Sequence, residues 1–151
     1  MEILTVQQKQ IAFAESCTAG LVSDFLARIP GASKVLWGSF VTYTVGAKIK
    51  MLGVPEELIA RSGAVSKSVV EAMASGALEK SGACWAFSVS GFAGPAEKEQ
   101  DFPVGTVWIG IAGRGGETEA KMFNFSGSRN EVREAAALTV LEEVLKRIKI
   151  I

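Results

Sequence analysis

The chain has 151 residues, 48% of them hydrophobic, and its 16 Lys and Arg residues balance its 16 Asp and Glu residues. A chain of this length buries about two-thirds of its unfolded surface, so we expect one domain, residues 1–151, whose core needs no disulfide. The absence of histidine excludes Ser-His-Asp and Cys-His triads and histidine metal sites. A catalytic proton must therefore be carried by lysine, tyrosine, a carboxylate or water.

Charge and hydropathy also limit the partners that we expect. Positive and negative charges are balanced, and the sequence has no run of basic residues that could neutralise several phosphates. Both observations argue against nucleic-acid binding. No segment approaches the roughly 18 apolar residues of a membrane span, and residues 1–10 lack the apolar region of a signal peptide. We therefore expect a cytoplasmic protein with a small-molecule substrate. Cys17 and Cys84 have no metal-ligand spacing and are expected to be free thiols, with Cys17 packed as a small residue.

Hydrophobic periodicity predicts a strand over residues 11–14 and then a helix whose apolar stripe runs from Leu21 to Ile29. Ser16 or Thr18 is the expected N-cap of this helix, and Pro30-Gly31 ends it. The same patterns predict strands over 35–44, 85–90, 104–112 and 119–125, and helices over 47–52, from Pro55, over 66–80 and over 130–149.

The predicted elements indicate a single three-layer α/β/α domain with a mixed, mostly parallel sheet of about five strands. The Gly-rich turn at 113–116 predicts that the last two strands form a hairpin. Ser66 is one candidate cap for the middle helix and Ser68 the other, since Ser68 with Glu71 fits a capping box. The last helix is expected to bury one set of residues and to carry two ion pairs on its outer side: Val132, Ala136, Leu141, Val144, Leu145 and Ile148, and the pairs Glu142/Lys146 and Glu143/Arg147.

Two segments contain groups suited to catalysis. The strand-to-helix turn over 14–20 gathers hydroxyls where backbone N–H groups can attract an anion or hold an oxyanion, although Ser16 or Thr18 can equally be a plain cap. Tyr43 closes a strand and Lys48 opens the next helix. If Lys48 is buried near a hydroxyl, it can be neutral enough to act as a base; the alternative is an exposed helix lysine.

Two further segments suit ligand binding. After a predicted strand, Gly91 and Gly94 in segment 88–95 allow the backbone to approach a ligand closely, unless the segment is an ordinary loop. Arg129 and Arg133 are four residues apart at the start of the last helix, a spacing suited to a phosphate or carboxylate; simple solvation of both is the alternative.

Several segments match one family in order and with similar spacing. They are Ala14-Glu15-Ser16-Cys17-Thr18, Val41-Thr42-Tyr43, Ala47-Lys48, Leu52-Gly53-Val54, Gly63-Ala64-Val65-Ser66, Ser90-Gly91-Phe92-Ala93-Gly94-Pro95 and Pro103-Val104-Gly105-Thr106-Val107-Trp108. From about Ile11 to Arg147, the chain resembles the C-terminal domain of the CinA family, the nicotinamide mononucleotide deamidases.

This resemblance implies an amidohydrolase that converts nicotinamide mononucleotide to nicotinate mononucleotide and ammonia in NAD salvage, with no metal and no cofactor. It assigns Ser16 as the nucleophile and Lys48 as the base, with Tyr43 as a possible proton relay. The substrate-binding residues that we expect are Thr18, Gly20, Ser90, Gly91, Ala93, Gly94, Gly105, Thr106, Arg129 and Arg133.

The chain departs from the usual family pattern around the expected pocket. The changed positions are Ala19, Val45-Gly46, residues 96–101 and Ser128. Two alternatives therefore stay open: a family member that binds a nucleotide-like ligand without turnover or acts on another amide, and a competence-linked interaction module. Only ten residues precede Ile11, so we expect a shorter helix before the first strand than the family usually has, and we expect the chain to work without the N-terminal partner domain that some members carry. We expect a homo-oligomer in which a second subunit covers exposed apolar sheet surface.

Overall fold

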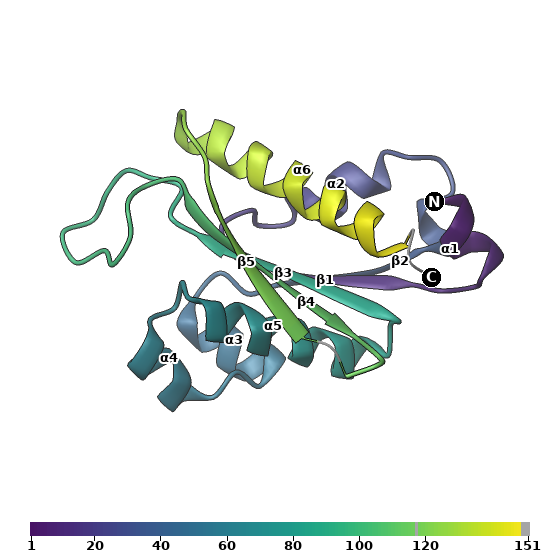
Figure 1. Cartoon of the computed structure of the whole chain (residues 1–151), viewed down its shortest axis with the longest axis horizontal. Helices are drawn as coiled ribbons and strands as arrows, with labels where there is room; N and C mark the ends of the chain where they lie inside the picture. The colour runs from purple at the N-terminus through teal and green to yellow at the C-terminus, as the bar shows by residue number, and fades with distance from the viewer. Residues whose placement is uncertain (117, 149–151) are drawn as a thin grey trace.

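The computed structural model describes residues 1–116 and 118–148 (Figure 1). In chain order the elements are α1 (Glu2–Val6), β1 (Ile11–Glu15), α2 (Leu21–Ala27), the 3-10 helix η1 (Ala32–Lys34), β2 (Leu36–Val41), α3 (Val45–Leu52), α4 (Glu56–Ser62), α5 (Lys67–Ser81), β3 (Trp85–Gly91), β4 (Thr106–Gly113), β5 (Thr118–Asn124) and α6 (Arg129–Ile148). The short helix α1 is the shortened helix expected before the first strand.

The five strands form one mixed sheet in the order β2-β1-β3-β4-β5. β1 pairs in parallel with β2 and β3, whereas β4 is antiparallel to both β3 and β5. Only β4 therefore opposes the other strands, as expected for a mostly parallel sheet that ends in a hairpin. Helices α2 and α6 cover one face, and α3, α4 and α5 cover the other (Figure 1). The predicted three-layer α/β/α domain is confirmed.

Each face of the sheet contributes to its own hydrophobic core, because neighbouring residues of a strand point to opposite faces. Phe13 of β1 belongs to the cluster beneath α2 and α6, and Ala12 and Ala14 belong to the cluster with α5. Small residues on this second face let α5 come close. A Cβ atom on Gly110 would lie 2.3 Å from the carbonyl oxygen of Val70, so β4 needs glycine there.

Several local predictions are confirmed. A helix follows Pro55, and α5 is capped by Ser66 rather than Ser68, since the Ser66 hydroxyl accepts a hydrogen bond from the Val69 N–H at 3.4 Å. β4 and β5 form the expected hairpin.

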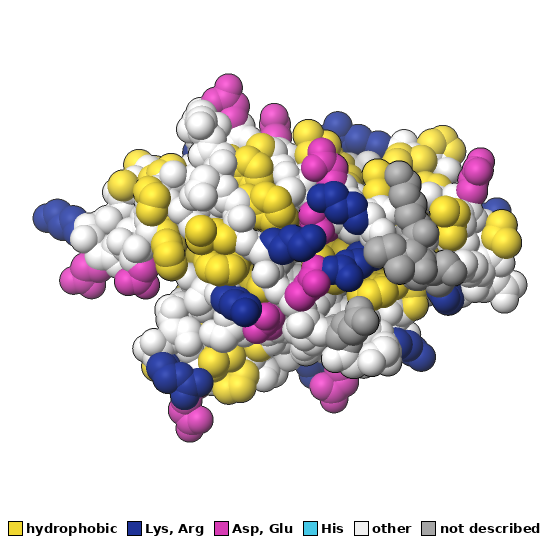
Figure 2. Space-filling view, viewed as in Figure 1, with side chains coloured by type: hydrophobic (Ala, Val, Ile, Leu, Met, Phe, Trp, Pro, Cys, Tyr) yellow, Lys and Arg dark blue, Asp and Glu magenta, His cyan; other side chains and the backbone are white. Residues whose placement is uncertain are grey.

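The outer side of α6 differs from the prediction. Leu145 is 52% exposed, and Glu143 is buried between Lys121 of β5 and Lys146, at 2.7 and 2.6 Å. Arg147 pairs with Glu119 of β5 instead of with Glu143. The expected helix end at Lys149 lies outside the described residues. Figure 2 shows basic and acidic side chains side by side over β5 and α6. The prediction failed because periodicity along α6 does not reveal which charges β5 brings to it.

Within residues 1–116 and 118–148, no helix is both long enough and apolar enough to cross a membrane.

Candidate active site

The candidate site lies where β1 and β3 end. Because parallel strands have their carboxyl ends at the same edge of the sheet, Ser16 after β1 lies near the Gly-rich segment after β3. The segment between β2 and α3 and the start of α6 complete a cavity of about 310 Å³. Such a volume is at the small end of the usual range for ligand pockets.

Ser16 and Lys48 meet in this cavity, although 32 residues separate them in sequence. The Lys48 ammonium nitrogen lies 2.9 Å from the Ser16 hydroxyl oxygen, and the Lys48 side chain is only 2% exposed. Thr44 caps α3 by accepting a hydrogen bond from the Ala47 N–H, which sets the helix start and hence the place of Lys48. Lys48 is therefore not the exposed helix lysine of the alternative interpretation.

Burial gives Lys48 the properties of a base. It lowers the pKa of the Lys48 side chain from its usual 10.5 to about 8, because removal from water penalises the charged form. Lys48 also donates to the backbone carbonyls of Thr42 and Tyr43, at 2.9 and 3.3 Å. A neutral amine has two N–H groups and one lone pair. In the charged form the third N–H of Lys48 donates to the Ser16 hydroxyl. Once that proton is lost, with both remaining N–H groups on the carbonyls, the lone pair faces the Ser16 hydroxyl.

Tyr43 contributes its backbone rather than its phenol to this pair. Its carbonyl accepts from Lys48 and lies 3.5 Å from the Ser16 oxygen. The side chain is 51% exposed, and its hydroxyl accepts a hydrogen bond from Arg129 at 2.8 Å. Arg129 also donates to the carbonyl of Gly94. The phenol thus points to Arg129, while the Lys48 nitrogen reaches the Ser16 oxygen directly; the proton relay through Tyr43 stays a prediction.

The predicted capping of α2 by Ser16 or Thr18 is wrong. Gly20, with a positive φ of 97°, is the N-cap residue, and the carboxylate of Glu15 accepts from the N–H groups of Val22 and Ser23 at 2.8 and 3.3 Å. The start of α2 is thus occupied by an internal anion. Glu15 is completely buried. Its sequence signals were its place in the first family segment and its charge at the end of an apolar strand.

Five of the ten predicted binding residues line the cavity. Its lining residues include Ser90, Gly91, Ala93, Gly94 and Arg129 among the predicted set. At Gly91 a Cβ atom would lie 2.7 Å from the carbonyl oxygen of Thr106, so a side chain does not fit there.

The cavity wall also contains residues that were not named as binding residues from the sequence: Ala64, Val65, Phe92, Pro95, Ala96, Glu97 and Gln100. Ala64, Val65, Phe92 and Pro95 fall inside the family segments, and Ala96, Glu97 and Gln100 fall in the divergent segment 96–101. Their position in a family segment or in segment 96–101 was therefore the sequence signal that could have identified them as cavity residues.

Five predicted binding residues do not line the cavity, because each has a structural partner elsewhere. Thr18 donates from its buried hydroxyl to Glu15 at 2.8 Å, and Gly20 caps α2. Gly105 permits close approach to Phe125, and Thr106 bonds to Asn124. Arg133 donates to the backbone carbonyls of Cys17 and Thr18.

The remaining candidate groups are less suited to chemistry. Cys17 lines the cavity but is buried, which raises the pKa of its thiol to about 11, so the thiol is protonated at neutral pH. Both cysteines are free thiols, as predicted. No group of three Cys, Asp or Glu side chains within the described residues is placed to hold a metal ion.

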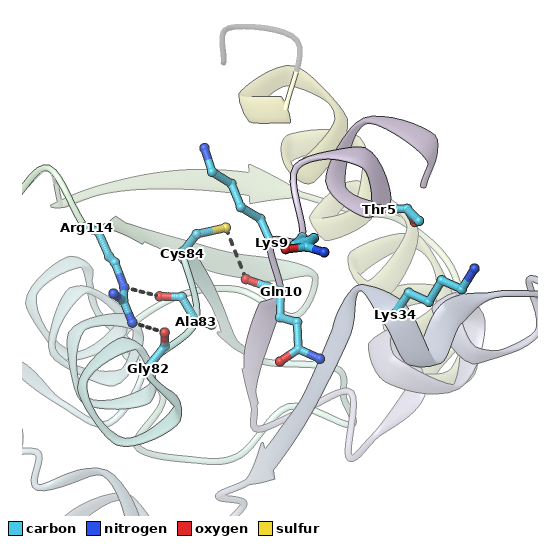
Figure 3. A pocket seen from close by; sticks show the side chains of 9 residues that line it. Thr5, Lys9, Gln10, Lys34, Gly82, Ala83, Cys84 and Arg114 are labelled. Atoms are coloured by element: carbon cyan, nitrogen blue, oxygen red, sulfur yellow. Dashed lines mark hydrogen bonds between the residues drawn. The ribbon is translucent and has the colours of Figure 1, made fainter.

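A larger cavity, of about 820 Å³, lies at the opposite end of the sheet (Figure 3). It is lined by Lys9, Lys34, Cys84 and Arg114 among others, and it contains none of the predicted catalytic or binding residues. Its cations come from the segment before β1, from η1 and from the turn after β4.

Comparison with known proteins identifies the family of this chain. Residues 1–148 match the family model of the CinA C-terminal domain. The chain belongs to the CinA C-terminal domain family. A CinA-like protein from Akkermansia muciniphila is 47% identical over 142 residues, which cover 94% of this chain and 34% of that protein. A putative competence-damage inducible protein from Symbiobacterium thermophilum is 44% identical over 150 residues, covering 94% and 35%.

Crystal structures of CinA-family proteins share the fold. The competence damage-inducible protein A from Klebsiella pneumoniae superposes with a TM-score of 0.92 at 33% identity, covering 98% of this chain and 91% of that chain. A competence/damage inducible protein from Agrobacterium tumefaciens gives 0.90 at 38% identity, covering 95% and 87%. The present CinA domain spans about one third of the length of the curated relatives above.

Proposed function

We propose that this CinA domain is an amidohydrolase that converts nicotinamide mononucleotide to nicotinate mononucleotide and ammonia, with Ser16 as nucleophile and Lys48 as base. The observation that carries this proposal is the buried contact of 2.9 Å between the Lys48 nitrogen and the Ser16 oxygen. A serine hydroxyl needs a base to become a nucleophile. This chain contains no histidine, and Lys48 has a pKa lowered to about 8.

The first half of the reaction forms an ester on Ser16. Neutral Lys48 accepts the hydroxyl proton while the Ser16 oxygen attacks the carboxamide carbon, and the carbonyl oxygen becomes an oxyanion. As the tetrahedral intermediate collapses, its C–N bond breaks and the Lys48 ammonium returns a proton to the departing nitrogen, which leaves as ammonia. One lysine thus serves first as base and then as acid.

The second half regenerates the enzyme. A water molecule takes the place of ammonia, Lys48 accepts its proton, and the resulting hydroxide attacks the ester carbon. The bond to Ser16 then breaks, nicotinate mononucleotide leaves, and Ser16 recovers its proton from Lys48. The carbonyls of Thr42 and Tyr43, which accept from Lys48, hold its nitrogen in place through both halves.

The wall of the cavity suits a phosphorylated substrate. Arg129 belongs to it, and two nitrogens of its guanidinium already donate to Tyr43 and Gly94. A guanidinium can form paired hydrogen bonds with phosphate oxygens, so a bound phosphate can replace these contacts. We therefore assign substrate phosphate binding to Arg129, beside the Gly-rich segment after β3.

Ammonia release from nicotinamide mononucleotide tests the proposal. The purified protein is incubated with the nucleotide in the presence of EDTA, and we expect ammonia and nicotinate mononucleotide in equal amounts. Ser16→Ala should abolish release while preserving nucleotide binding by calorimetry. Ser88→Ala is the matched control: Ser88 is also buried, but it donates to Val70 at 2.5 Å and does not line the cavity.

The possible results discriminate between the open interpretations. Binding of the nucleotide by wild type without ammonia release would contradict hydrolysis and favour a ligand-binding family member. Release that EDTA abolishes would contradict the serine–lysine mechanism. Neither binding nor release would leave the interaction module as the better interpretation.

A further inference from the structure

The larger cavity, which we call the amino-end cavity, is lined by cations and by no described acidic residue. Its volume is about 820 Å³, and Lys9, Lys34 and Arg114 all belong to its wall. The other lining residues carry polar or small side chains: Thr5, Gln8, Gln10, Gly82, Ala83 and Cys84. Because the charges of the whole chain are balanced, this cavity is a local excess of positive charge.

The sheet places the three cations along one edge. Lys9 lies two residues before β1, Lys34 ends η1 just before β2, and Arg114 directly follows β4. Because β4 runs antiparallel to β3, its end lies beside the start of β3. In the order β2-β1-β3-β4, three strand spacings separate the outermost cations, or about 14 Å at the usual distance between strands. Figure 3 shows the three side chains around the cavity.

Two of these charges act on the same point of the cavity wall. Cys84 precedes β3, between β1 and β4. Its N–H and its thiol donate to the carbonyl of Gln10 at 2.9 and 3.1 Å, and its carbonyl accepts from the Arg114 N–H at 3.2 Å. Burial raises the pKa of the Cys84 thiol, whereas the charges of Lys9 and Arg114 lower it. The fields of both cations therefore overlap at Cys84.

The cations are available to a ligand. Within the described residues, Lys9, Lys34 and Arg114 form no ion pair with a carboxylate. Arg114 donates from Nε and Nη2 to the carbonyls of Ala83 and Gly82, which fixes its guanidinium at the end of α5. Its Nη1 finds no acceptor in the described part of the chain and stays free to donate to an anion.

We propose that the amino-end cavity binds a chain of condensed phosphates, inorganic or attached to a nucleoside, with Lys9, Lys34 and Arg114 contacting its phosphate groups. Lysine and arginine are the usual protein donors to phosphate oxygens. Cations spaced along a sheet edge suit several anionic groups in a line better than one. The wall has no aromatic side chain on which a base could stack, so the phosphates provide the recognition.

This inference goes beyond the proposed function and does not depend on it. The amino-end cavity lies at the opposite end of the sheet from Ser16 and shares no lining residue with the smaller cavity. Loss of ammonia release would therefore leave phosphate binding intact, and loss of phosphate binding would leave the serine–lysine pair intact.

Calorimetric titration of the full chain in EDTA tests the site with orthophosphate, pyrophosphate and tripolyphosphate. We expect affinity to rise about tenfold from orthophosphate to tripolyphosphate, since a longer chain contacts more cations. Affinity should fall as salt increases, because the contacts are electrostatic. Adenosine triphosphate should bind within about threefold of tripolyphosphate if only the phosphates are recognised. Citrate, an anion without phosphate, should bind more weakly than tripolyphosphate.

Substitutions locate the binding. Lys9→Met and Lys34→Met should each lower tripolyphosphate affinity about three- to fivefold. Lys67→Met is the matched control, because Lys67 is exposed and lines neither cavity, so the variant loses the same net charge elsewhere. Amide NMR of the wild type should show tripolyphosphate shifting the signals of Cys84 and Arg114 more than those of Ser90 and Gly91.

Several results would overturn the proposal. These are equal affinity for orthophosphate and tripolyphosphate, citrate binding as tight as tripolyphosphate binding, or binding of adenosine triphosphate without binding of tripolyphosphate. A loss in Lys67→Met as large as in Lys9→Met would show attraction by net charge alone. Thermal melting establishes that each variant is folded. If a variant does not fold, the NMR shifts of the wild type decide, and shifts confined to Ser90 and Gly91 would place the anion in the smaller cavity instead.

Discussion

The two ends of the sheet both carry a cavity and an arginine that donates to two successive carbonyls, yet they differ in chemistry. At the carboxyl end of β1, the smaller cavity of about 310 Å³ contains Lys48 at 2% exposure. At the amino end, the cavity of about 820 Å³ is lined by Lys34 and Arg114, both exposed to solvent. Cavity volume and positive charge therefore favour the amino end of the sheet as the active site, whereas the burial of its lysine favours the carboxyl end.

Burial is the better criterion for the active site, because it lowers the pKa of a lysine and so allows it to act as a base. A solvated ammonium is fully protonated at neutral pH and can only attract anions. Lys48, removed from water and held by the carbonyls of Thr42 and Tyr43, is partly neutral near pH 8 and faces a hydroxyl. The comparison shows that a candidate base is better sought by its desolvation and its partners than by the size of the cavity around it.

The largest effect should come from removing one lysine from each cavity. Lys48→Met should lower kcat for ammonia release by about 10²–10⁴-fold, since it removes the general base, whereas Lys34→Met should leave kcat within about twofold of wild type. Steady-state ammonia assays on the two variants make the measurement. Equal rates for Lys48→Met and wild type would show that the two ends do not differ in the way we propose.

The pH dependence of activity should show whether the base is a buried lysine with a lowered pKa or an ordinary solvated lysine. Lys48 acts as a base only when neutral, so kcat/KM should rise about tenfold per pH unit below its pKa of about 8 and level off above it. The sign follows from the lowered pKa of a cationic group, whose deprotonated form gains population as pH increases. Initial rates in buffers from acidic to alkaline pH measure this profile. A rate that decreases as pH rises through 8 would contradict a neutral lysine base.

We expect the smallest effect from substituting the arginine of each cavity by lysine. Arg129→Lys keeps the charge but loses the paired donors that suit phosphate, so KM for nicotinamide mononucleotide should rise about three- to tenfold, with kcat nearly unchanged. Arg114→Lys should change neither constant. An unchanged KM for Arg129→Lys would remove Arg129 from phosphate binding, and a raised KM for Arg114→Lys would point to the larger cavity as a substrate site.

Local sequence patterns were sufficient for most of the fold. Gly53 ends α3, Pro55 precedes α4 and Ser66 caps α5, because caps and breakers act within one helical turn. The Gly-rich turn at 113–116 joins the strands of the predicted hairpin. The mixed sheet followed from the alternation of strands and helices together with that hairpin.

Contacts between distant segments were not predictable in the same way. The burial of Glu143 depends on Lys121 of β5, and the capping of α2 depends on Glu15 at the end of β1, which also accepts from Ser39 of β2 at 2.8 Å. Periodicity reports which side of an element is apolar. It does not report which charge a neighbouring element supplies.

The sequence by itself determined the classes of chemistry open to this protein and the segments that would carry it. A chain without histidine and with Ser16 and Lys48 in family motifs already indicated a serine–lysine pair. Only the tertiary structure decided that Lys48 is buried against Ser16, that the Tyr43 phenol turns to Arg129 and that Arg133 holds the Ser16 turn. The physical reason is that the pKa of a lysine and the direction of a backbone N–H depend on desolvation and on partners that folding brings from distant parts of the chain.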